Sequence, residues 1–241
     1  MKKLFCILLA IAMLLSLCAC GKDTAKDDDD NDNIRGTITT DPTETTAPGN
    51  QQPDNTPEFS LGKTSGGTYT NDFLGLTFNL PIGWEFYTEK QIMDLNNIAA
   101  EYMDDSVVQQ LKNATIIYDM YAMQSFSGSN VNITLEKITP AQKKALNLKV
   151  ILENQIPTMK STFSNMGLAD IKINYQKITV NGKEFDGITV SAKWLATAST
   201  HHQDFYEKII VFNKGDYLAY VTAACIQKDN TDYILSCISF T

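Results

Sequence analysis

Two adjacent histidines are the first residues in this chain that could carry chemistry. His201 and His202 are its only histidines, and Asp204 and Glu207 follow them in the polar stretch "TASTHHQDFYE". One imidazole with one of these carboxylates could bind a metal or transfer a proton. Adjacent residues of a strand or loop point to opposite sides, so the two rings are poorly placed to chelate one ion together. We expect a surface turn here, with a metal-dependent or hydrolytic site as the alternative.

Cys225 and Cys237 are the second candidate pair. In an exported chain they could form a disulfide between the last predicted strand and the last predicted helix, closing a loop of about a dozen residues that contributes roughly 2–3 kcal/mol. The alternative is two buried thiols that act as small apolar side chains. No cationic residue is adjacent to either cysteine to lower its thiol pKa, so we expect no catalytic thiol.

The stretch "YDMYAMQSF" carries aromatic and methionine side chains on both faces of a predicted strand. Strict alternation separates two sets of side chains: Tyr118, Met120 and Ala122 on one face, and Asp119, Tyr121 and Met123 on the other. The strand is either packed on both sides, or one face lines an adaptable apolar groove for a peptide, lipid or aromatic ligand. The candidate groove residues are Tyr118, Met120, Tyr121 and Met123.

No catalytic or metal-binding motif accompanies these candidates. The acidic run that begins at Asp27 fails as an EF-hand loop, because counting from Asp28 puts Asn33 at the sixth position and Thr39 at the twelfth, where Gly and Glu are required. The sequence contains no glycine-rich phosphate loop, nucleophile elbow or metalloprotease motif. We therefore predict no catalytic residue, no metal and no cofactor.

The N-terminus has the pattern of an export signal. Lys2 and Lys3 precede an apolar core over residues 4–17, which is shorter than the roughly 20 residues of a spanning helix. The residues that follow, Leu17-Cys18-Ala19-Cys20, resemble the lipobox of bacterial lipoproteins. That resemblance implies cleavage after Ala19 and acylation of Cys20. An ordinary signal peptide without a lipid is the alternative.

Lipidation would give lasting attachment to a membrane. Two or three acyl chains of the palmitate type contribute about 0.8 kcal/mol for each buried methylene, whereas a single chain binds only marginally. The longest later apolar stretch, "YLAYVTAACI", is far too short to span a bilayer. We expect localisation to the outer, extracytoplasmic face of the cell membrane.

Composition divides the chain into three parts. Residues 1–19 are the signal peptide, residues 20–68 an acidic tether rich in Thr, Pro and Asp, and residues 69–241 a single domain. The tether has too few apolar residues to fold, so we expect disorder and a reach on the order of 40 Å. The formal net charge of −8 argues against nucleic acid as a partner.

Residue patterns in the domain predict strands and helices in mixed order. Alternating apolar residues over 74–80 predict a strand, which the turn "PIG" ends before Trp84. Thr88 and Asp104 are predicted N-caps of two helices, and residues 114–126 and 131–138 form a predicted hairpin. Thr139-Pro140 begins a predicted long helix that ends at Gly167 and is kinked or split at Pro157.

The C-terminal part is predicted to be an antiparallel meander followed by a helix. Asn181-Gly182 is a strong signal for a type I′ hairpin, because both central residues of that turn need positive φ. A second hairpin is predicted around residues 213–216. A short helix over 232–240, capped by residues 229–231, follows, with Ile234, Cys237 and Ile238 facing inward.

Together these elements predict an α+β fold with a mostly antiparallel sheet and helices packed on its faces. The opening "GLTFNLPIGW", the long central helix, the meander and the closing "DYILSCISF" resemble the PsbP-like family, an α/β/α sandwich. The resemblance covers most of residues 69–241. It implies binding, assembly or accessory roles, mostly non-enzymatic, and gives no catalytic residues.

The sequence therefore predicts a lipid-anchored, extracytoplasmic binding or accessory protein of the cell envelope that acts without catalysis. Its expected partners are the membrane, through the anchor, and an envelope protein, small molecule or peptide. The alternative is an extracytoplasmic hydrolase or metal-dependent enzyme that uses His201 or His202 with nearby carboxylates.

Overall fold

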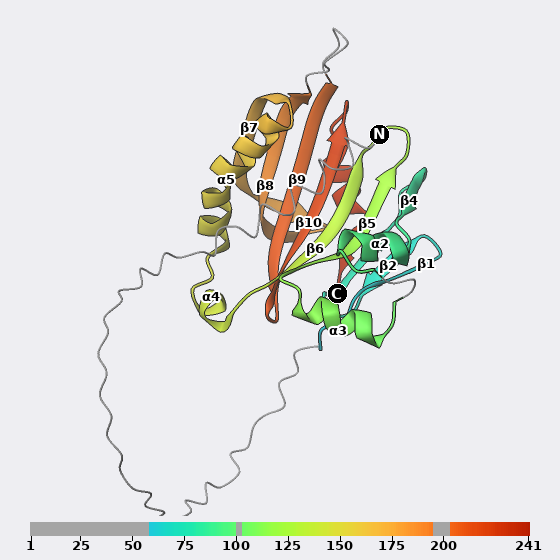
Figure 1. The fold of residues 1–241 in the computed structure, drawn as a ribbon. Helices are drawn as coiled ribbons and strands as arrows, with labels where there is room; N and C mark the ends of the chain where they lie inside the picture. Colours follow the sequence, from blue (N-terminus) through green and yellow to red (C-terminus); the bar gives the residue numbers. More distant parts are fainter. Residues whose placement is uncertain (1–57, 100–102, 195–202) are drawn as a thin grey trace, which may run out of the picture.

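A computed structural model describes residues 58–99, 103–194 and 203–241, which form two antiparallel sheets and several helices (Figure 1). The α+β class predicted from the sequence is confirmed. The predicted cleavage site at Ala19, the lipidated Cys20, most of the tether, and His201 and His202 lie outside the described residues.

The larger sheet has the strand order β4-β5-β6-β10-β9-β8-β7, and every neighbouring pair is antiparallel. Its strands are β4 (Trp84–Phe86), β5 (Ile116–Gln124), β6 (Asn130–Lys137), β7 (Leu168–Val180), β8 (Lys183–Trp194), β9 (Gln203–Lys214) and β10 (Tyr217–Ile226). The predicted hairpins are confirmed: β5 pairs with β6, β7 with β8, and β9 with β10. At the β7–β8 turn, Asn181 and Gly182 have φ of 48° and 82°, as a type I′ turn requires.

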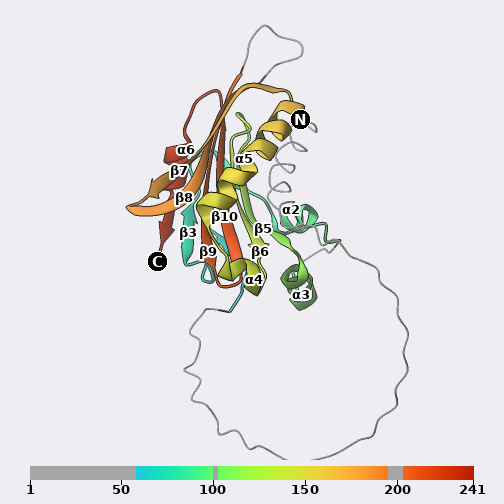
Figure 2. The ribbon, with the colours of Figure 1, turned by 90° about the vertical axis from the view of Figure 1, so that its left-hand side faces the viewer.

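One face of the large sheet is covered by helix α5 (Leu148–Asn165). Leu152, Met159 and Phe163 of α5 pack on an apolar cluster from β8, β9 and β10. In Figure 2 this helix lies across the strands. The predicted single helix is wrong in one respect, because it divides at Asn147 and not at Pro157. Asn147 accepts a hydrogen bond from the Val150 amide and starts α5, and a separate short helix, α4 (Pro140–Lys144), precedes it.

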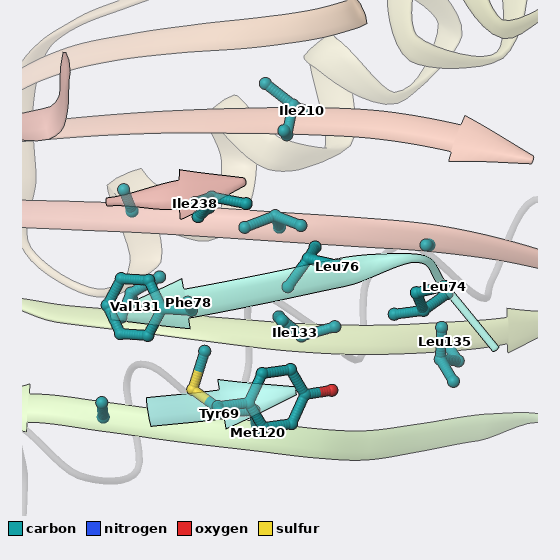
Figure 3. Packing of buried hydrophobic residues seen from close by; sticks show 14 of the residues in the cluster. Tyr69, Leu74, Leu76, Phe78, Met120, Val131, Ile133, Leu135, Ile210 and Ile238 are labelled. Carbon is teal, nitrogen blue, oxygen red and sulfur yellow. The ribbon is translucent and has the colours of Figure 1, made fainter. Parts of the chain in front are cut away.

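The opposite face is covered mainly by a second, smaller sheet with the order β1-β2-β3-β11. Its strands are β1 (Lys63–Ser65), β2 (Thr68–Asn71), β3 (Leu76–Asn79) and β11 (Ile238–Phe240). Figure 3 shows Tyr69, Leu76 and Phe78 of this sheet lying over Met120 and Ile133 of the large sheet. The main hydrophobic core therefore lies between two sheets. The α/β/α sandwich implied by the resemblance would have a layer of helices in place of the small sheet.

Two short helices flank β5. Helix α2 (Glu89–Leu95) starts at Thr88 with a capping box to Gln91, and α3 (Asp105–Asn113) starts at Asp104, whose side chain accepts from the Val107 amide. Both N-caps agree with the sequence prediction. Ile92 and Leu95 of α2 pack on the α5 side of the large sheet, whereas Met93 of α2 belongs to the core between the sheets. Val107 and Leu111 of α3 belong to the same core.

The C-terminal segment differs from its prediction. Helix α6 (Thr231–Ser236) ends early, and the next residues form β11, which pairs with β3. Ile234 and Ile238 are buried as expected, while Cys237 is only half-buried. The chain leaves the helix because Ile238 pairs with Phe78 and completes the edge of the small sheet.

The folded domain begins before the predicted boundary at residue 69. Residues 58–62, called the strap below, run along the domain and continue directly into β1. Phe59 of the strap stacks on Tyr217 at 4.8 Å between ring centroids and meets Phe73 edge-on at 5.5 Å. Phe59 and Leu61 both pack against the core, so two apolar side chains at the end of a long polar stretch are enough to hold this segment.

Candidate functional site

A pocket of about 530 Å³ opens beside the edge of β5, bounded by the strap, β2, α2 and α3. Apolar and aromatic side chains form most of its wall, including Tyr69, Tyr87, Ile92, Met120 and Tyr121, and Asp119 is its buried carboxyl group. This volume lies within the range of pockets that hold small organic ligands.

The pocket exists because β4 covers only part of β5. Strand pairing stops at Phe86, opposite Ala122, and the last hydrogen bond runs from the Tyr87 amide to the Tyr121 carbonyl at 2.8 Å. Further along, the Asn96 side chain accepts from the Tyr118 amide and donates to the Tyr118 carbonyl, both at 2.8 Å. Between the hydrogen bonds of Tyr87 and those of Asn96, the edge of β5 faces the pocket.

A β-bulge at Asp119 sets which side chains face the pocket. The pairing of β5 with β6 shifts register between Tyr118 and Met120, so one extra residue is inserted in β5. Strict alternation therefore fails at this point. Asp119 and Met120 both lie on the side of the small sheet, where the sequence analysis placed Asp119 on the face opposite Met120.

The four predicted groove residues are divided by this bulge. Met120 and Tyr121 line the pocket. Tyr118 and Met123 instead join Tyr121 in a cluster under α2, on the other side of the sheet. Two of the four predicted groove residues therefore line the pocket and two pack under a helix, and the ligand groove itself stays a prediction.

The side chain of Asp119 accepts three hydrogen bonds at the wall of the pocket. Its Oδ1 accepts a hydrogen bond from the Gly62 amide at 2.9 Å. Its Oδ2 accepts from the Asn71 side-chain amide at 2.6 Å and from the Tyr69 hydroxyl. Asn71 also donates to the Ser60 carbonyl at 3.3 Å, so one carboxyl group and one amide hold the strap to β2 and β5.

Burial decides the ionisation of this network. It raises the pKa of Asp119 above its ordinary value, and the hydrogen bonds from Tyr69, Gly62 and Asn71 offset part of the rise. Burial and the adjacent Asp119 carboxylate also raise the pKa of Tyr69 well above its ordinary value, so the hydroxyl remains a donor.

Tyrosine rings form the wall on the α2 side. The rings of Tyr87 and Tyr121 are tilted against each other with centroids 4.4 Å apart. Burial raises the pKa of both hydroxyls, and for Tyr121 the nearby Tyr87 and Tyr118 hydroxyls add to the rise. This wall is uncharged at neutral pH and presents π surface to a ligand.

Glu207 is a second buried carboxyl group, separate from the pocket. It lies on β9, opposite Val190 and Ala224, on the face that α5 covers. The side chain is 1% exposed, and neither carboxyl oxygen has a hydrogen-bond partner in the described part of the chain. Burial raises the pKa of Glu207 to about 8, so the group is largely protonated at neutral pH.

The structure separates the carboxylates that were candidates to act with the histidines. Asp204 is exposed, while Glu207 is buried three residues later on the other face of β9. A histidine near this strand could therefore work with one of them and not with both. Over residues 58–99, 103–194 and 203–241, no cluster of three or more His, Cys, Asp or Glu side chains could hold a metal ion.

Cys225 and Cys237 are free thiols in the structure, the first buried and the second half-buried. Burial raises the pKa of both, which disfavours the reactive thiolate. Their pairing in an oxidising compartment stays a prediction. No helix among the described residues has the length and hydropathy needed to cross a membrane.

Sequence reasoning missed the strap and Asp119 as parts of the site. The available signal was a single acidic residue inside the apolar run "IIYDMYAM", since a carboxyl group there is either buried with donors or at an irregularity of the strand. The donors come from residues 48 to 57 positions away, so local patterns could not identify them.

Comparisons with known proteins do not assign this chain to a family. No family model matches the chain, and no curated protein matches it. Among solved structures, it is similar to LpqN of Mycobacterium tuberculosis, described as involved in cell envelope biogenesis, with 8% sequence identity and a TM-score of 0.36. The match covers 66% of this chain and 75% of LpqN. At this TM-score, the similarity carries no argument about function.

Proposed function

We propose that this protein is a lipid-anchored, extracytoplasmic binding or accessory protein whose ligand occupies the Asp119 pocket. The anchor is Cys20, acylated after cleavage at Ala19, and the acidic segment between it and the strap spans the distance to the membrane. The domain belongs, in this proposal, with the PsbP-like proteins, with a second sheet in place of one helical layer. The protein acts at the cell envelope by contact and not by catalysis.

The observation that carries the proposal is the pocket at the edge of β5. Its walls are aromatic and methionine side chains with a small number of polar groups, which is the composition of small-molecule sites. Methionine side chains such as Met103 and Met120 adapt to ligands of different shape. The donors around Asp119 fix the position of its carboxyl group at the pocket wall.

A pair of matched valine variants tests this proposal. Val108 lines the pocket from α3, so Val108→Trp should fill it. Val150 is 48% exposed on α5, so Val150→Trp makes the same change away from the pocket. The neutral fluorescent probe N-phenyl-1-naphthylamine should bind wild type and Val150→Trp equally, and Val108→Trp about tenfold more weakly. Equal binding by all three proteins would exclude the pocket as the ligand site.

The enzymatic alternative is tested separately at the histidines. If the protein works by contact, the double variant His201→Ala and His202→Ala should keep its fold, its probe binding and any cellular phenotype that depends on the wild type. Loss of that phenotype with the fold intact would favour chemistry at this pair over the binding role.

A further inference from the structure

Among the residues that the structure describes, the carboxyl group of Asp119 has no counter-ion. It is 7% exposed, and no ion pair among the described residues includes it. Its three partners, Gly62, Asn71 and Tyr69, are neutral donors. Hydrogen bonds from neutral groups stabilise a buried carboxylate only in part, since the negative charge itself stays uncompensated.

Asp119 also keeps an unused acceptor position. A carboxylate offers about two acceptor sites on each oxygen. Oδ2 receives hydrogen bonds from Asn71 and Tyr69, whereas Oδ1 receives one from Gly62. One site on Oδ1 is therefore available, and Asp119 is part of the pocket wall. A ligand that donates a hydrogen bond and brings a positive charge would complete this group.

The remaining wall favours a cation as well. Tyr69, Tyr87 and Tyr121 line the pocket, and the π face of an aromatic ring attracts ammonium groups. Glu89, in the first turn of α2, adds an exposed carboxylate at the rim. Lys63, on β1, is the one lysine among the described lining residues, and it is exposed.

We propose that the ligand of the Asp119 pocket is a protonated primary amine attached to an apolar or aromatic body. The ammonium group donates to Oδ1 of Asp119, and the body fills the space between the strap and the tyrosine wall. A quaternary ammonium ion fits less well, because it has no N–H to donate. The inference rests on the proposed function and adds the chemical class of the ligand.

This mode of binding couples the ligand to a proton. At low pH Asp119 is protonated and offers no charge, so the amine binds weakly; as the pH rises, Asp119 ionises and the affinity increases. The other titratable groups around the pocket are Lys63, Tyr69, Tyr87, Glu89 and Tyr121. A free alkylamine loses its proton at about pH 10, so the ligand keeps its charge while Asp119 ionises.

Two isosteric probes test the inference on the full chain in detergent, with protein-free detergent as the blank. Isothermal titration calorimetry at pH 7.5 should show that 4-phenylbutylamine binds at least tenfold more tightly than the neutral 4-phenylbutanol. The affinity for the amine should rise between pH 5 and pH 8, while that for the alcohol should not. Equal affinities would overturn the ammonium assignment and leave the pocket as an apolar site. No binding of either probe would overturn both proposals.

The variant Asp119→Asn checks the residue assigned to this role. It removes the charge and keeps the size, so it should lose the preference for the amine while still binding the alcohol. Asp72→Asn is the matched control, because Asp72 is exposed and is not part of the pocket wall. Retention of the preference in Asp119→Asn would contradict the inference. If Asp119→Asn does not fold, the wild-type comparison of amine and alcohol decides.

Discussion

The amide of Gly62 donates a hydrogen bond over 2.9 Å to Oδ1 of Asp119, a residue 57 positions later in the chain. This contact fixes the strap against β5 and closes one side of the pocket. Its geometry depends on the absence of a side chain at residue 62, because a Cβ there would lie 2.2 Å from the Tyr69 ring. The strap, the carboxyl group and the tyrosine form one unit.

Replacement of Gly62 should release the strap. In Gly62→Ala, the new methyl group collides with Tyr69, so either the ring or the strap must move, and overpacking of this kind costs about 1–3 kcal/mol. Limited proteolysis should cut the variant near residues 58–62 faster than wild type, and its melting temperature should fall. Ser65→Ala, at an exposed position of β1, is the control and should behave as wild type. Wild-type cleavage kinetics in Gly62→Ala would contradict this account of the strap.

Loss of the Tyr69 hydroxyl should destabilise the domain. Tyr69→Phe removes one of the three donors to Asp119 in a buried site, and an unsatisfied buried group costs about 1–3 kcal/mol. Tyr175→Phe removes a hydroxyl that donates to Asp186 at a partly buried site, so its effect should stay below about 1 kcal/mol. Urea denaturation of both variants measures the difference. Equal losses of stability would show that the Asp119 network contributes no more than a surface contact.

Glu207 should make the domain less stable as the pH rises. Its pKa is about 8 in the folded state against 4.5 ordinarily, so between these values the folded protein holds a proton that the unfolded chain releases. This contribution to stability is complete below pH 4.5 and is lost through pH 8, by about 1.4 kcal/mol per pH unit.

The variant Glu207→Gln isolates this effect. Urea denaturation at pH 5, 6, 7 and 8 should show a weaker decline with pH than in wild type, and the variant should be the more stable protein at pH 8. Glu184→Gln, at an exposed position of β8, should keep the wild-type decline. Parallel curves for wild type and Glu207→Gln would exclude Glu207 as the source.

Attachment to the membrane should depend on one cysteine. Cys20→Ala removes the thiol that carries the acyl chains, so the protein should leave the membrane fraction or remain as an uncleaved precursor. Cys18→Ala should stay anchored, because Leu17, a large residue, precedes Cys18 and makes it a poor cleavage site. Membrane fractionation with mass spectrometry of the N-terminus measures both results. An unchanged membrane fraction in Cys20→Ala would argue against the anchor.

The elements that local sequence determines were predictable. Thr88 and Asp104 are N-caps because a short polar side chain there accepts a hydrogen bond from a backbone amide three residues later. Asn181-Gly182 forms its turn because these two residues tolerate positive φ. Such caps and turns depend only on neighbouring residues. Together with the apolar alternation of the strands, they were enough to predict the hairpins of the large sheet.

The features that were missed depend on distant residues. The bulge at Asp119 breaks the alternation, and it is stabilised by donors on the strap and on β2. Ile238 continues a helical pattern in the sequence, but pairs with Phe78 in a strand. The strap is held by Phe59 and Leu61, which pack on the core between the sheets, and by its hydrogen bonds to Asp119 and Asn71. No local pattern carries this information.

The small sheet is built from both ends of the domain, since β1 to β3 come first in the chain and β11 comes last. Until β11 pairs, β3 has an unpaired edge, and Phe185 of β8 and Phe212 of β9 lack their contact with Phe240. Closing the small sheet therefore needs a pairing between the first and last strands of the domain, which is a long-range step in folding. For a protein proposed to cross a membrane before it folds, a late step of this kind would keep the chain unfolded during translocation.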